Sequence, residues 1–418
     1  MNKSKVVGGI DIGSAKISTL IAQVNEEITG TNPTVNIIGA SSVASGGVRK
    51  GQIVDIEEAV EKVTLSVEAA ERMAGYNLES AYLAIGGAHI SSLNSHGVVA
   101  VSDPSGEISP ADEERVIEAA KAISLPSSRE IIHVLPREFV VDGESGVRDP
   151  IGMTGVRLEV ETHLVTVSSS AVKNIAKTVS EVGVDIKELV FSAYASSISV
   201  LTETEKELGV VLVDIGGGVT SIAAYIDGSL CYSGAIPIGA KNVTNDLAIG
   251  LKVSLEDAEK IKIALSEKKA KEESDVVDIK EMGLSESKKV SKKTLIEGII
   301  RPRLNEIFTM VRLELEKVGI SNRVPSGVVV TGGGALTVGA ADVAKRTLSL
   351  PARVGNPMGV AGLIDEIMVP QFAAAIGLIL YGAKLEERDE SRMFGNKFKF
   401  PTSGMFGKIV EAIKDLLP

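Results

Sequence analysis

The sequence predicts an α/β protein with two similar lobes and a small α+β subdomain inserted into the first of them. The segment at 10–26 (IDIGSAKISTLIAQVNE) is echoed at 213–228 (VDIGGGVTSIAAYIDG), and both read as a strand, an Asp-x-Gly turn and a second strand. A duplicated unit implies two related lobes that face each other. Between the repeats, from 87 to about 165, the composition changes, which indicates a separate inserted unit.

The first lobe is predicted from aliphatic strands and one amphipathic helix. Strands are expected at 6–11, 17–23, 35–43 and 81–86. The stretch 56–74 repeats apolar residues every three or four positions, which is the spacing of a helix with one buried face. These apolar positions are Ile56, Val60, Val63, Val67 and Ala70. Gly75 is expected to end this helix, because glycine readily adopts the left-handed conformation found at helix ends.

The insertion and the second lobe are predicted in the same way. In the insertion a helix is expected to begin at Ser109-Pro110, since proline is tolerated at the first helical position. Its strands are expected at 98–101, 131–134, 138–142 and 156–167. A helix is expected after the insertion, at 171–182. The second lobe is expected to have strands at 210–215, 219–226, 230–236 and 326–331. Its helices are expected at 241–250, 255–265 and 294–318, the last with a kink at Pro302, and 267–293 is expected to be mobile or solvated.

Composition excludes several classes of protein. The net charge of −11, from 44 basic and 55 acidic residues, argues against a general nucleic-acid binder, which needs a basic face. The single cysteine, Cys231, allows no intramolecular disulfide and no cysteine-based zinc site, and is expected to be a small buried apolar residue. The four histidines lack the close spacing of metal ligands. A reducing cytoplasm fits all these features.

No stretch of the sequence predicts a membrane-spanning helix. The N-terminus is basic but lacks the apolar core of a signal peptide. The most apolar stretch, 369–383, contains Gln371 and is shorter than the roughly 20 apolar residues that cross a bilayer. We expect it to form a buried helix.

Three glycine turns at strand ends predict a site for a phosphate-bearing ligand. In both repeats an Asp ends a buried strand and a Gly follows two positions later, so backbone N–H groups can approach phosphate without hindrance from side chains. The two carboxylates can hold a hydrated Mg²⁺. Hydroxyl groups and one lysine in the turns can bind phosphate oxygens. The candidates are Asp11, Gly13, Ser14 and Lys16 in the first turn, Asp214, Gly216, Gly217, Gly218 and Thr220 in the second, and Gly332, Gly333 and Gly334 in the third.

The order of these turns resembles that of the actin-like ATPase superfamily, which includes actin, sugar kinases and heat-shock chaperone ATPases. No Walker pattern occurs, which excludes a P-loop protein. Longer runs narrow the resemblance to the FtsA family of bacterial cell-division proteins, over essentially the whole chain. These runs include SHGVVAVSD (95–103), VIEAAKAISLPSSREIIHVLPREFVVDG (116–143), VRDPIGMTGVRLEVETHLVT (147–166), LTETEKELGVVLVDIGGG (201–218), IPIGAKNVTNDLAIGL (236–251) and IIRPRLNEIF (299–308).

The resemblance implies an actin-like fold with duplicated ribonuclease-H-like lobes and an insertion of the 1C type. It implies ATP and Mg²⁺ as ligands, with the metal held by Asp11 and Asp214 through water and the third turn against the adenosine. The implied division of the chain is subdomain 1A at 1–86 and 167–208, 1C at 87–166, 2A at 209–251 and 320–368, 2B at 252–319, a return helix at 369–384, a flexible linker at 385–404 and an amphipathic helix at 405–418.

The resemblance also implies a function and partners. Members of this family polymerise and tether the tubulin-like FtsZ to the inner face of the cytoplasmic membrane at the division site, where they recruit later division proteins. They bind the acidic tail of FtsZ through subdomain 2B, where Lys293, Arg301 and Asn305 lie in the matching region. An arginine on a long helix is, however, more often a solvated or ion-paired residue, and both interpretations stay open.

Two departures from the pattern bear on ATP hydrolysis. The second turn commonly reads G-G-G-T-T-D in this family, and here Val219 and Ser221 replace its first Thr and its Asp. Related proteins often have Glu-Pro where this chain has Ser192 and Ala193. A carboxylate there is a plausible group to position the attacking water. We therefore expect ATP binding with weak hydrolysis at most, and assign no catalytic residue.

The last residues, MFGKIVEAIKDLLP, predict an amphipathic helix. Its apolar face would consist of Phe406, Ile409, Val410, Ile413, Leu416 and Leu417. Such a helix would be roughly 20 Å long, too short to span a bilayer. It could dock on the protein itself, but the charged linker before it favours an interfacial membrane helix, as the resemblance implies.

Two other hypotheses about the function remain open. An actin-like kinase or chaperone ATPase would need a catalytic base and a substrate pocket, or a substrate domain after the ATPase, and the sequence offers no clear candidate for either. A related pilus-assembly protein would share the insertion but lack the terminal amphipathic helix.

Overall fold

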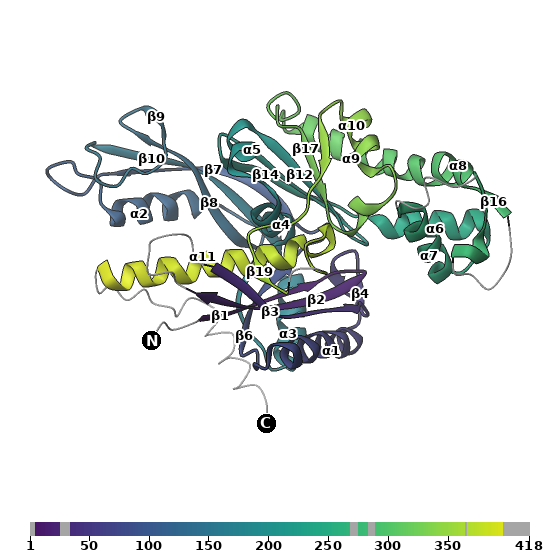
Figure 1. The fold of residues 1–418 in the computed structure, drawn as a ribbon. Helices are drawn as coiled ribbons and strands as arrows, with labels where there is room; N and C mark the ends of the chain where they lie inside the picture. The colour runs from purple at the N-terminus through teal and green to yellow at the C-terminus, as the bar shows by residue number, and fades with distance from the viewer. Residues whose placement is uncertain (1–4, 26–33, 268–274, 283–288, 364–365, 396–418) are drawn as a thin grey trace.

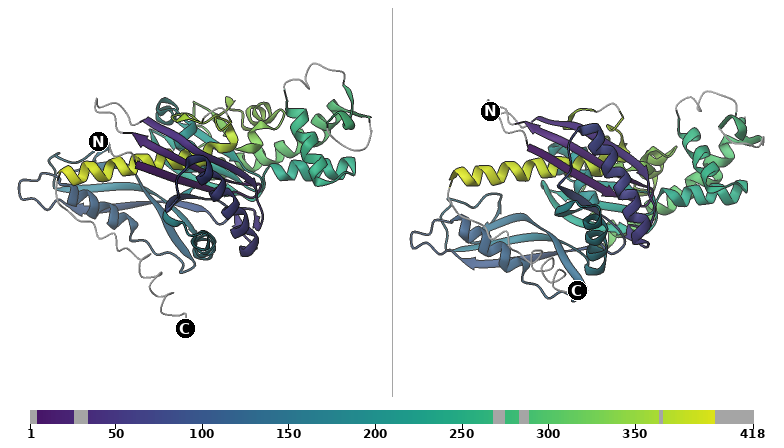
Figure 2. Two further views of the ribbon diagram at one scale, coloured as in Figure 1. Left: turned by 60° about the horizontal axis from the view of Figure 1, so that its bottom comes forward. Right: turned by 90° about the horizontal axis from the view of Figure 1, so that it is seen from below.

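Two mixed sheets form the body of the protein. The computed structural model describes residues 5–25, 34–267, 275–282, 289–363 and 366–395. In Figure 1 the sheets lie between two smaller units, the insertion at one end and a helical subdomain at the other. Both views in Figure 2 keep these two units at opposite ends of the molecule.

The sheet of the first lobe has the strand order β11-β6-β1-β2-β3-β19. Strand β1 pairs antiparallel with β2 and parallel with β6. The strands are β1 (Lys5–Ile12), β2 (Lys16–Asn25), β3 (Thr34–Ala44), β6 (Ser80–Ile85), β11 (Asp185–Phe191) and β19 (Ala361–Gly362).

The sheet of the second lobe repeats this arrangement, with the order β14-β13-β12-β17-β18. Its strands are β12 (Val210–Ile215), β13 (Thr220–Ile226), β14 (Ser229–Ile236), β17 (Val328–Thr331) and β18 (Ala352–Val354). Strand β12 pairs antiparallel with β13 and parallel with β17, as β1 does with β2 and β6. The predicted duplication, and with it the two-lobed α/β fold, is confirmed.

Helices cover both faces of the first sheet, because successive residues of a strand point to opposite faces. Residues such as Ile10 and Ile21 join the core beneath α1 (Ile56–Ala74) and α3 (Ser169–Glu181). Val7 and Leu20 belong to the opposite core, beneath α11 (Ala373–Gly395). Helix α1 has the predicted bounds, with an Asp55 cap at its start and a left-handed Gly75 at its end.

Helix α4 (Ser192–Val200) crosses α11 at very close range. A Cβ placed on Gly377 would lie 1.8 Å from the backbone carbonyl oxygen of Ala195. Only glycine fits there, so the two backbones touch directly. Helix α4 also packs against β12 and β13, and therefore joins the two lobes.

The insertion is a four-stranded sheet with one helix, and its strand order is β7-β10-β8-β9. The elements are β7 (Ser91–Ala100), α2 (Pro110–Lys121), β8 (Arg129–Val141), β9 (Glu144–Val147) and β10 (Arg157–Ser168). The strands predicted at 131–134 and 138–142 are a single strand. Its register against β10 shifts between Pro136 and Glu138, which leaves Arg137 as the extra residue of a bulge. Pro136 lacks the N–H that a regular strand ladder needs, which is typical of the end of a strand. Here the strand continues past Pro136 and forms only a bulge.

The helical subdomain comprises α6 (Ala240–Leu251), α7 (Leu255–Ser266), α8 (Lys292–Leu295) and α9 (Arg301–Lys317). The helix predicted at 294–318 begins earlier and contains a π-helical segment, Ile296–Ile300, between α8 and α9. Pro302 explains it, because a residue without an N–H leaves a carbonyl in the preceding turn without its usual donor. The stretch 267–293, predicted as solvated, includes a short ladder of β15 (Val276–Asp278) with β16 (Lys289–Ser291).

The apolar stretch at 369–383 forms a buried helix, as predicted. It begins as a 3₁₀ turn, Pro370–Phe372, and continues as α11 to Gly395, so the segment predicted as a linker from 385 onward starts as helix. Charged residues such as those after Ala383 are good helix formers, and this is why their composition alone was misleading.

Candidate nucleotide site

The first glycine turn links the end of β1 to the start of β2. It is closed by a hydrogen bond of 3.0 Å from the Gly13 N–H to the Lys16 carbonyl. The Ser14 hydroxyl oxygen accepts a hydrogen bond of 2.9 Å from the Gly51 N–H. Gly51 belongs to the hairpin of β4 (Val48–Arg49) and β5 (Gln52–Ile53), which therefore braces the turn.

The second glycine turn links β12 to β13 in the same way. The Gly216 N–H donates to the Val219 carbonyl at 2.9 Å. The first N–H groups of α6, those of Ala240 and Lys241, donate to the carbonyls of Gly216 and Gly217 at 2.9 and 2.8 Å. The Lys241 ammonium also reaches the Ser14 carbonyl in the other lobe, at 2.6 Å.

The two turns, which are about 200 residues apart in the sequence, lie against each other. A Cβ on Gly217 would be 2.6 Å from the Cβ of Ala15. A Cβ on Gly218 would be 3.1 Å from the Ser14 hydroxyl oxygen. A side chain at Gly217 would push the lobes apart, and one at Gly218 would require its neighbours to shift slightly, so glycine permits their close approach.

Three charged side chains lie behind the turns, and each keeps some exposed surface. Burial raises the pKa of Asp214 to about 6, even though the Ser196 hydroxyl stabilises the carboxylate through a 2.6 Å hydrogen bond. Burial also raises the pKa of Asp11, although Lys16 opposes this shift. The pKa of Lys16 falls to about 8, because its loss of hydration outweighs the attraction of the two carboxylates. Charged groups whose pKa values are shifted together in this way are typical of binding and catalytic sites.

The Lys16 ammonium has no hydrogen-bond acceptor within the part of the chain that the structure describes. It lies 3.5 Å from the centre of the Phe372 ring, which supplies a cation–π contact. A buried ammonium can donate three hydrogen bonds, so this group is available to an incoming anion.

The third glycine turn lies directly beside the second. Gly332 has a φ of 78°, and a Cβ there would be 2.2 Å from an Asp214 carboxylate oxygen. A Cβ on Gly334 would be 2.3 Å from the Ile215 side chain. All three predicted turns therefore converge on Asp214 and its neighbours.

Thr220 has a different role from the one predicted. Its side chain is fully buried, and its hydroxyl donates to the Ile238 carbonyl at 2.8 Å. The residue is the first of β13, so its hydroxyl stabilises the connection to α6 and is not free to bind phosphate.

The two positions that depart from the family pattern lie together. The hydroxyl oxygens of Ser192, at the start of α4, and Ser221, on β13, are 3.4 Å apart. A Cβ on Gly86 would be 2.7 Å from the Ser192 oxygen. Hydroxyls thus stand side by side where the pattern has carboxylates.

Several residues of the site were not predicted from the sequence. Ser196 bonds Asp214 from α4, Phe372 covers Lys16, and the Lys50–Gly51 hairpin tip touches both turns. None of these belongs to a glycine turn. The short run of Ser and Ala in α4 was the one available signal, since such small residues allow close packing.

The residues predicted to bind a partner lie on successive elements of the helical subdomain. Lys293 is exposed on α8. Arg301 is half-buried and pairs with Glu297 at 2.8 Å, and its Nε has no acceptor among the described residues. The exposed Asn305 accepts a hydrogen bond from Thr347 on α10 (Ala340–Leu348) at 3.1 Å.

The predicted membrane residues, Phe406, Ile409, Val410, Ile413, Leu416 and Leu417, lie outside the described residues. Within the described ranges, no helix combines the length and apolarity needed to cross a membrane. Nor do three or more His, Cys, Asp or Glu side chains gather there as metal ligands.

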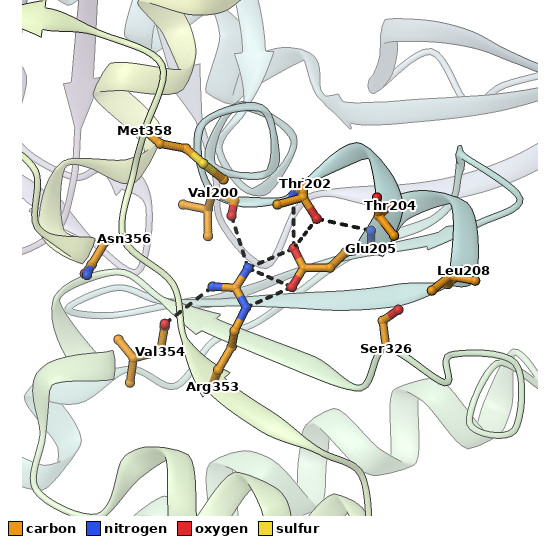
Figure 3. A pocket seen from close by; sticks show the side chains of 10 residues that line it. All are labelled: Val200, Thr202, Thr204, Glu205, Leu208, Ser326, Arg353, Val354, Asn356 and Met358. Atoms are coloured by element: carbon orange, nitrogen blue, oxygen red, sulfur yellow. Dashed lines mark hydrogen bonds and ion pairs between the residues drawn. The ribbon is translucent and has the colours of Figure 1, made fainter.

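A pocket of about 540 Å³ lies away from the glycine turns, beside the edge strand β18. In Figure 3 the Arg353 guanidinium at its centre contacts Glu205 of α5 (Glu203–Leu208). Both carboxylate oxygens of Glu205 lie 2.8 Å from this guanidinium. The charges of this pocket are thus already paired.

Comparison with known proteins identifies relatives over nearly the whole chain. The family profile described as "SHS2 domain inserted in FTSA" matches residues 87–166, and that described as "Cell division protein FtsA" matches 211–377. The chain is 40% identical over 402 residues to the cell division protein FtsA of Borreliella burgdorferi, covering 96% of each. It is 36% identical over 400 residues to that of Escherichia coli K12, covering 93% of each.

Solved structures share the fold at low sequence identity. The PilM–PilN type IV pilus biogenesis complex matches with a TM-score of 0.61 and 18% identity, covering 90% of this chain and 98% of that chain. MreB5 of Spiroplasma citri bound to ADP matches with a TM-score of 0.54 and 14% identity, covering 92% and 98%. These similarities identify the fold as actin-like.

Proposed function

The chain belongs to the FtsA family of cell-division proteins, and on this premise we propose that it binds ATP with Mg²⁺ between its lobes, polymerises, and tethers FtsZ to the inner face of the cytoplasmic membrane. The observation that carries the nucleotide part of the proposal is the direct contact between the Gly217 and Ala15 turns. Opposed glycine turns from two lobes are a natural clamp for a polyphosphate. A relative by fold, MreB5, has been solved with bound ADP.

The residues at the turns fit a magnesium nucleotide. Lys16 has a buried ammonium without an acceptor, which suits a phosphate oxygen. Asp11 and Asp214 have raised pKa values and would be stabilised as carboxylates by a cation. When bound, Mg²⁺ would neutralise phosphate charge, and two carboxylates acting through water suit its preference for retained waters.

The test is calorimetric titration of the full chain with ATP in the presence and absence of Mg²⁺. We expect Mg²⁺-dependent binding with one nucleotide per chain. The matched variant Gly217→Val should abolish it, because the new side chain would collide with Ala15. Gly298→Ala is the control, since a Cβ there meets no atom within 4 Å. Undiminished binding by Gly217→Val would contradict the proposed site.

ATP hydrolysis is expected to be slow, at least 100-fold below the typical enzyme turnover of about 10 per second. The reason is that Ser192 stands where related proteins often have a glutamate that could position the attacking water, and a hydroxyl is a poor base for activating water. Phosphate release by the purified chain with Mg²⁺ measures the rate. Ser192→Glu should increase it. A wild-type turnover near 10 per second would overturn this expectation.

The partner part of the proposal predicts that Arg301→Glu weakens binding of the acidic FtsZ tail by about tenfold or more. Charge reversal would remove the guanidinium and put two acidic groups four residues apart with Glu297, where like charges repel. Fluorescence anisotropy with a labelled tail peptide measures the affinity. Arg312→Glu, on the same helix and paired with Glu316, is the control. Equal losses in both variants would indicate a general charge effect.

A further inference from the structure

A second, smaller cleft lies where the insertion meets the second lobe. Its volume is about 260 Å³, and its walls come from β7 and β8 of the insertion and from β13, β14 and the segment after α9. Figure 1 shows β7 running beside β14. None of the three glycine turns lines this cleft.

Hydrogen bonds connect the insertion to β14 of the second lobe at the joint around the cleft. The Ser92 hydroxyl donates to the Ser233 carbonyl at 2.7 Å and accepts from the Ser233 N–H at 3.0 Å. The buried His163 bridges the Asn94 side chain at 2.7 Å and the Ser233 hydroxyl at 3.0 Å. The walls are therefore held in place without any ligand.

Two arginines face this cleft from opposite sides of the joint. Arg137 comes from the insertion, where it is the extra residue of the β8 bulge, and bulges redirect side chains away from the regular sheet. Arg323 comes from the segment after α9. Both guanidinium groups lie near the Cys231 thiol. Burial raises the pKa of this thiol to about 11, and the positive charge of each arginine partly offsets that rise.

Neither guanidinium has a partner among the described residues. The Arg137 Nε is shielded from solvent and has no hydrogen-bond acceptor there. Asp227 is close enough to influence Cys231, yet it forms no ion pair with either arginine in the described part of the chain. The Tyr232 hydroxyl is bonded to Glu314 at 2.9 Å. A buried N–H without an acceptor is unusual, and here it belongs to an arginine that shares its cleft with a second arginine without a partner among the described residues.

We propose that this cleft binds a small oxyanion, with Arg137 and Arg323 as its ligands. Guanidinium groups match carboxylate and phosphate oxygens in geometry as well as in charge. The volume suits an anion of the size of phosphate, and is small for a nucleotide. Since the two arginines belong to different units, a bound anion adds contacts across the joint and stabilises the insertion against the second lobe.

The test is titration of the full chain with inorganic phosphate at constant ionic strength, followed by calorimetry and by thermal unfolding. We expect saturable binding and a rise in melting temperature. Arg137→Gln and Arg323→Gln should each weaken the affinity for phosphate at least about tenfold and reduce the rise in melting temperature. Arg137→Lys should retain part of the binding because it keeps the charge. A parallel titration with succinate distinguishes carboxylates from phosphates as the preferred anion.

Arg157→Gln is the matched control, since Arg157 lies on β10 of the same insertion and pairs with Glu159 at 3.0 Å. It should bind phosphate like the wild type. If Arg137→Gln fails to fold, Arg323→Gln still decides, because the Arg323 side chain is exposed. Unchanged phosphate affinity in the Arg323 variant would overturn the proposal. Binding lost only when Lys16 is replaced would also overturn it and would assign the phosphate to the glycine turns.

Discussion

Replacing Asp214 by asparagine is expected to weaken Mg²⁺-dependent ATP binding at least about 100-fold and, at neutral pH, to raise the melting temperature by a few degrees. The first effect follows from loss of one of the two carboxylates proposed to hold the metal. The second follows from the raised pKa of Asp214, about 6 against 3.8, since an ionised group that folding makes harder to ionise destabilises the folded state. Asparagine keeps an oxygen that can accept the Ser196 hydrogen bond.

The pH dependence of this gain has a definite sign. Well above pH 6 the wild-type carboxylate is ionised when folded, and the destabilisation is fully present. Between pH 6 and about 4 the folded protein takes up the proton more readily than the unfolded chain, so the wild type gains stability relative to the variant. Calorimetric unfolding from pH 7.5 to 4.5 should show the two melting temperatures converging.

Asp246→Asn is the control for this experiment, because Asp246 pairs with Arg303 at 2.6 Å within the helical subdomain. It should leave ATP binding unchanged and bring no gain in stability. An Asp214→Asn protein that is less stable than the wild type at pH 7.5, or that binds Mg-ATP normally, would refute the account of the site.

Deleting 405–418 is expected to reduce sedimentation with anionic lipid vesicles to background while leaving ATP affinity unchanged. Six apolar side chains are available for the membrane interface, and each contributes roughly 1.5–3 kcal/mol at most when buried. Ordering of the helix and incomplete insertion reduce this sum, so attachment should be reversible for one chain. Polymerisation would present many helices at once and strengthen it.

Two point variants separate an amphipathic helix from a general effect of the truncation. Ile413→Asp places a charge on the apolar face and should release the protein from vesicles. Lys414→Gln changes the polar face and should have a small effect. Vesicle binding that survives the deletion would show that another part of the chain contacts lipid.

The fold could be predicted to a large extent because it depends on local patterns that recur. Aliphatic strands ending in Asp-x-Gly turns occur twice, and the helix of 56–74 has both its periodicity and its terminal Gly75 in the sequence. The convergence of the turns also followed from the duplication, since corresponding turns of paired lobes meet at one edge.

What could not be predicted depends on contacts between distant segments. Whether the Thr220 hydroxyl faces a ligand or the Ile238 carbonyl is decided by the path of the chain after β14. The hydrogen bond of Ser196 to Asp214 requires α4 to lie against β12. The break predicted between the strands at 131–134 and 138–142 is a bulge, and the kink predicted at Pro302 accompanies a π-helical segment. The form of each irregularity depended on the neighbouring residues.

The contact of Gly377 with the Ala195 carbonyl has a mechanical consequence. Since no side chain separates the two backbones at the crossing, we expect α4 and α11 to move together. Ser196, next to that contact, holds Asp214. From the crossing, α11 extends for roughly 27 Å, so a tilt of about 10° at the nucleotide end displaces its far end by roughly 5 Å. We therefore expect a small movement at the Asp214 carboxylate to appear as a larger displacement at the far end of α11.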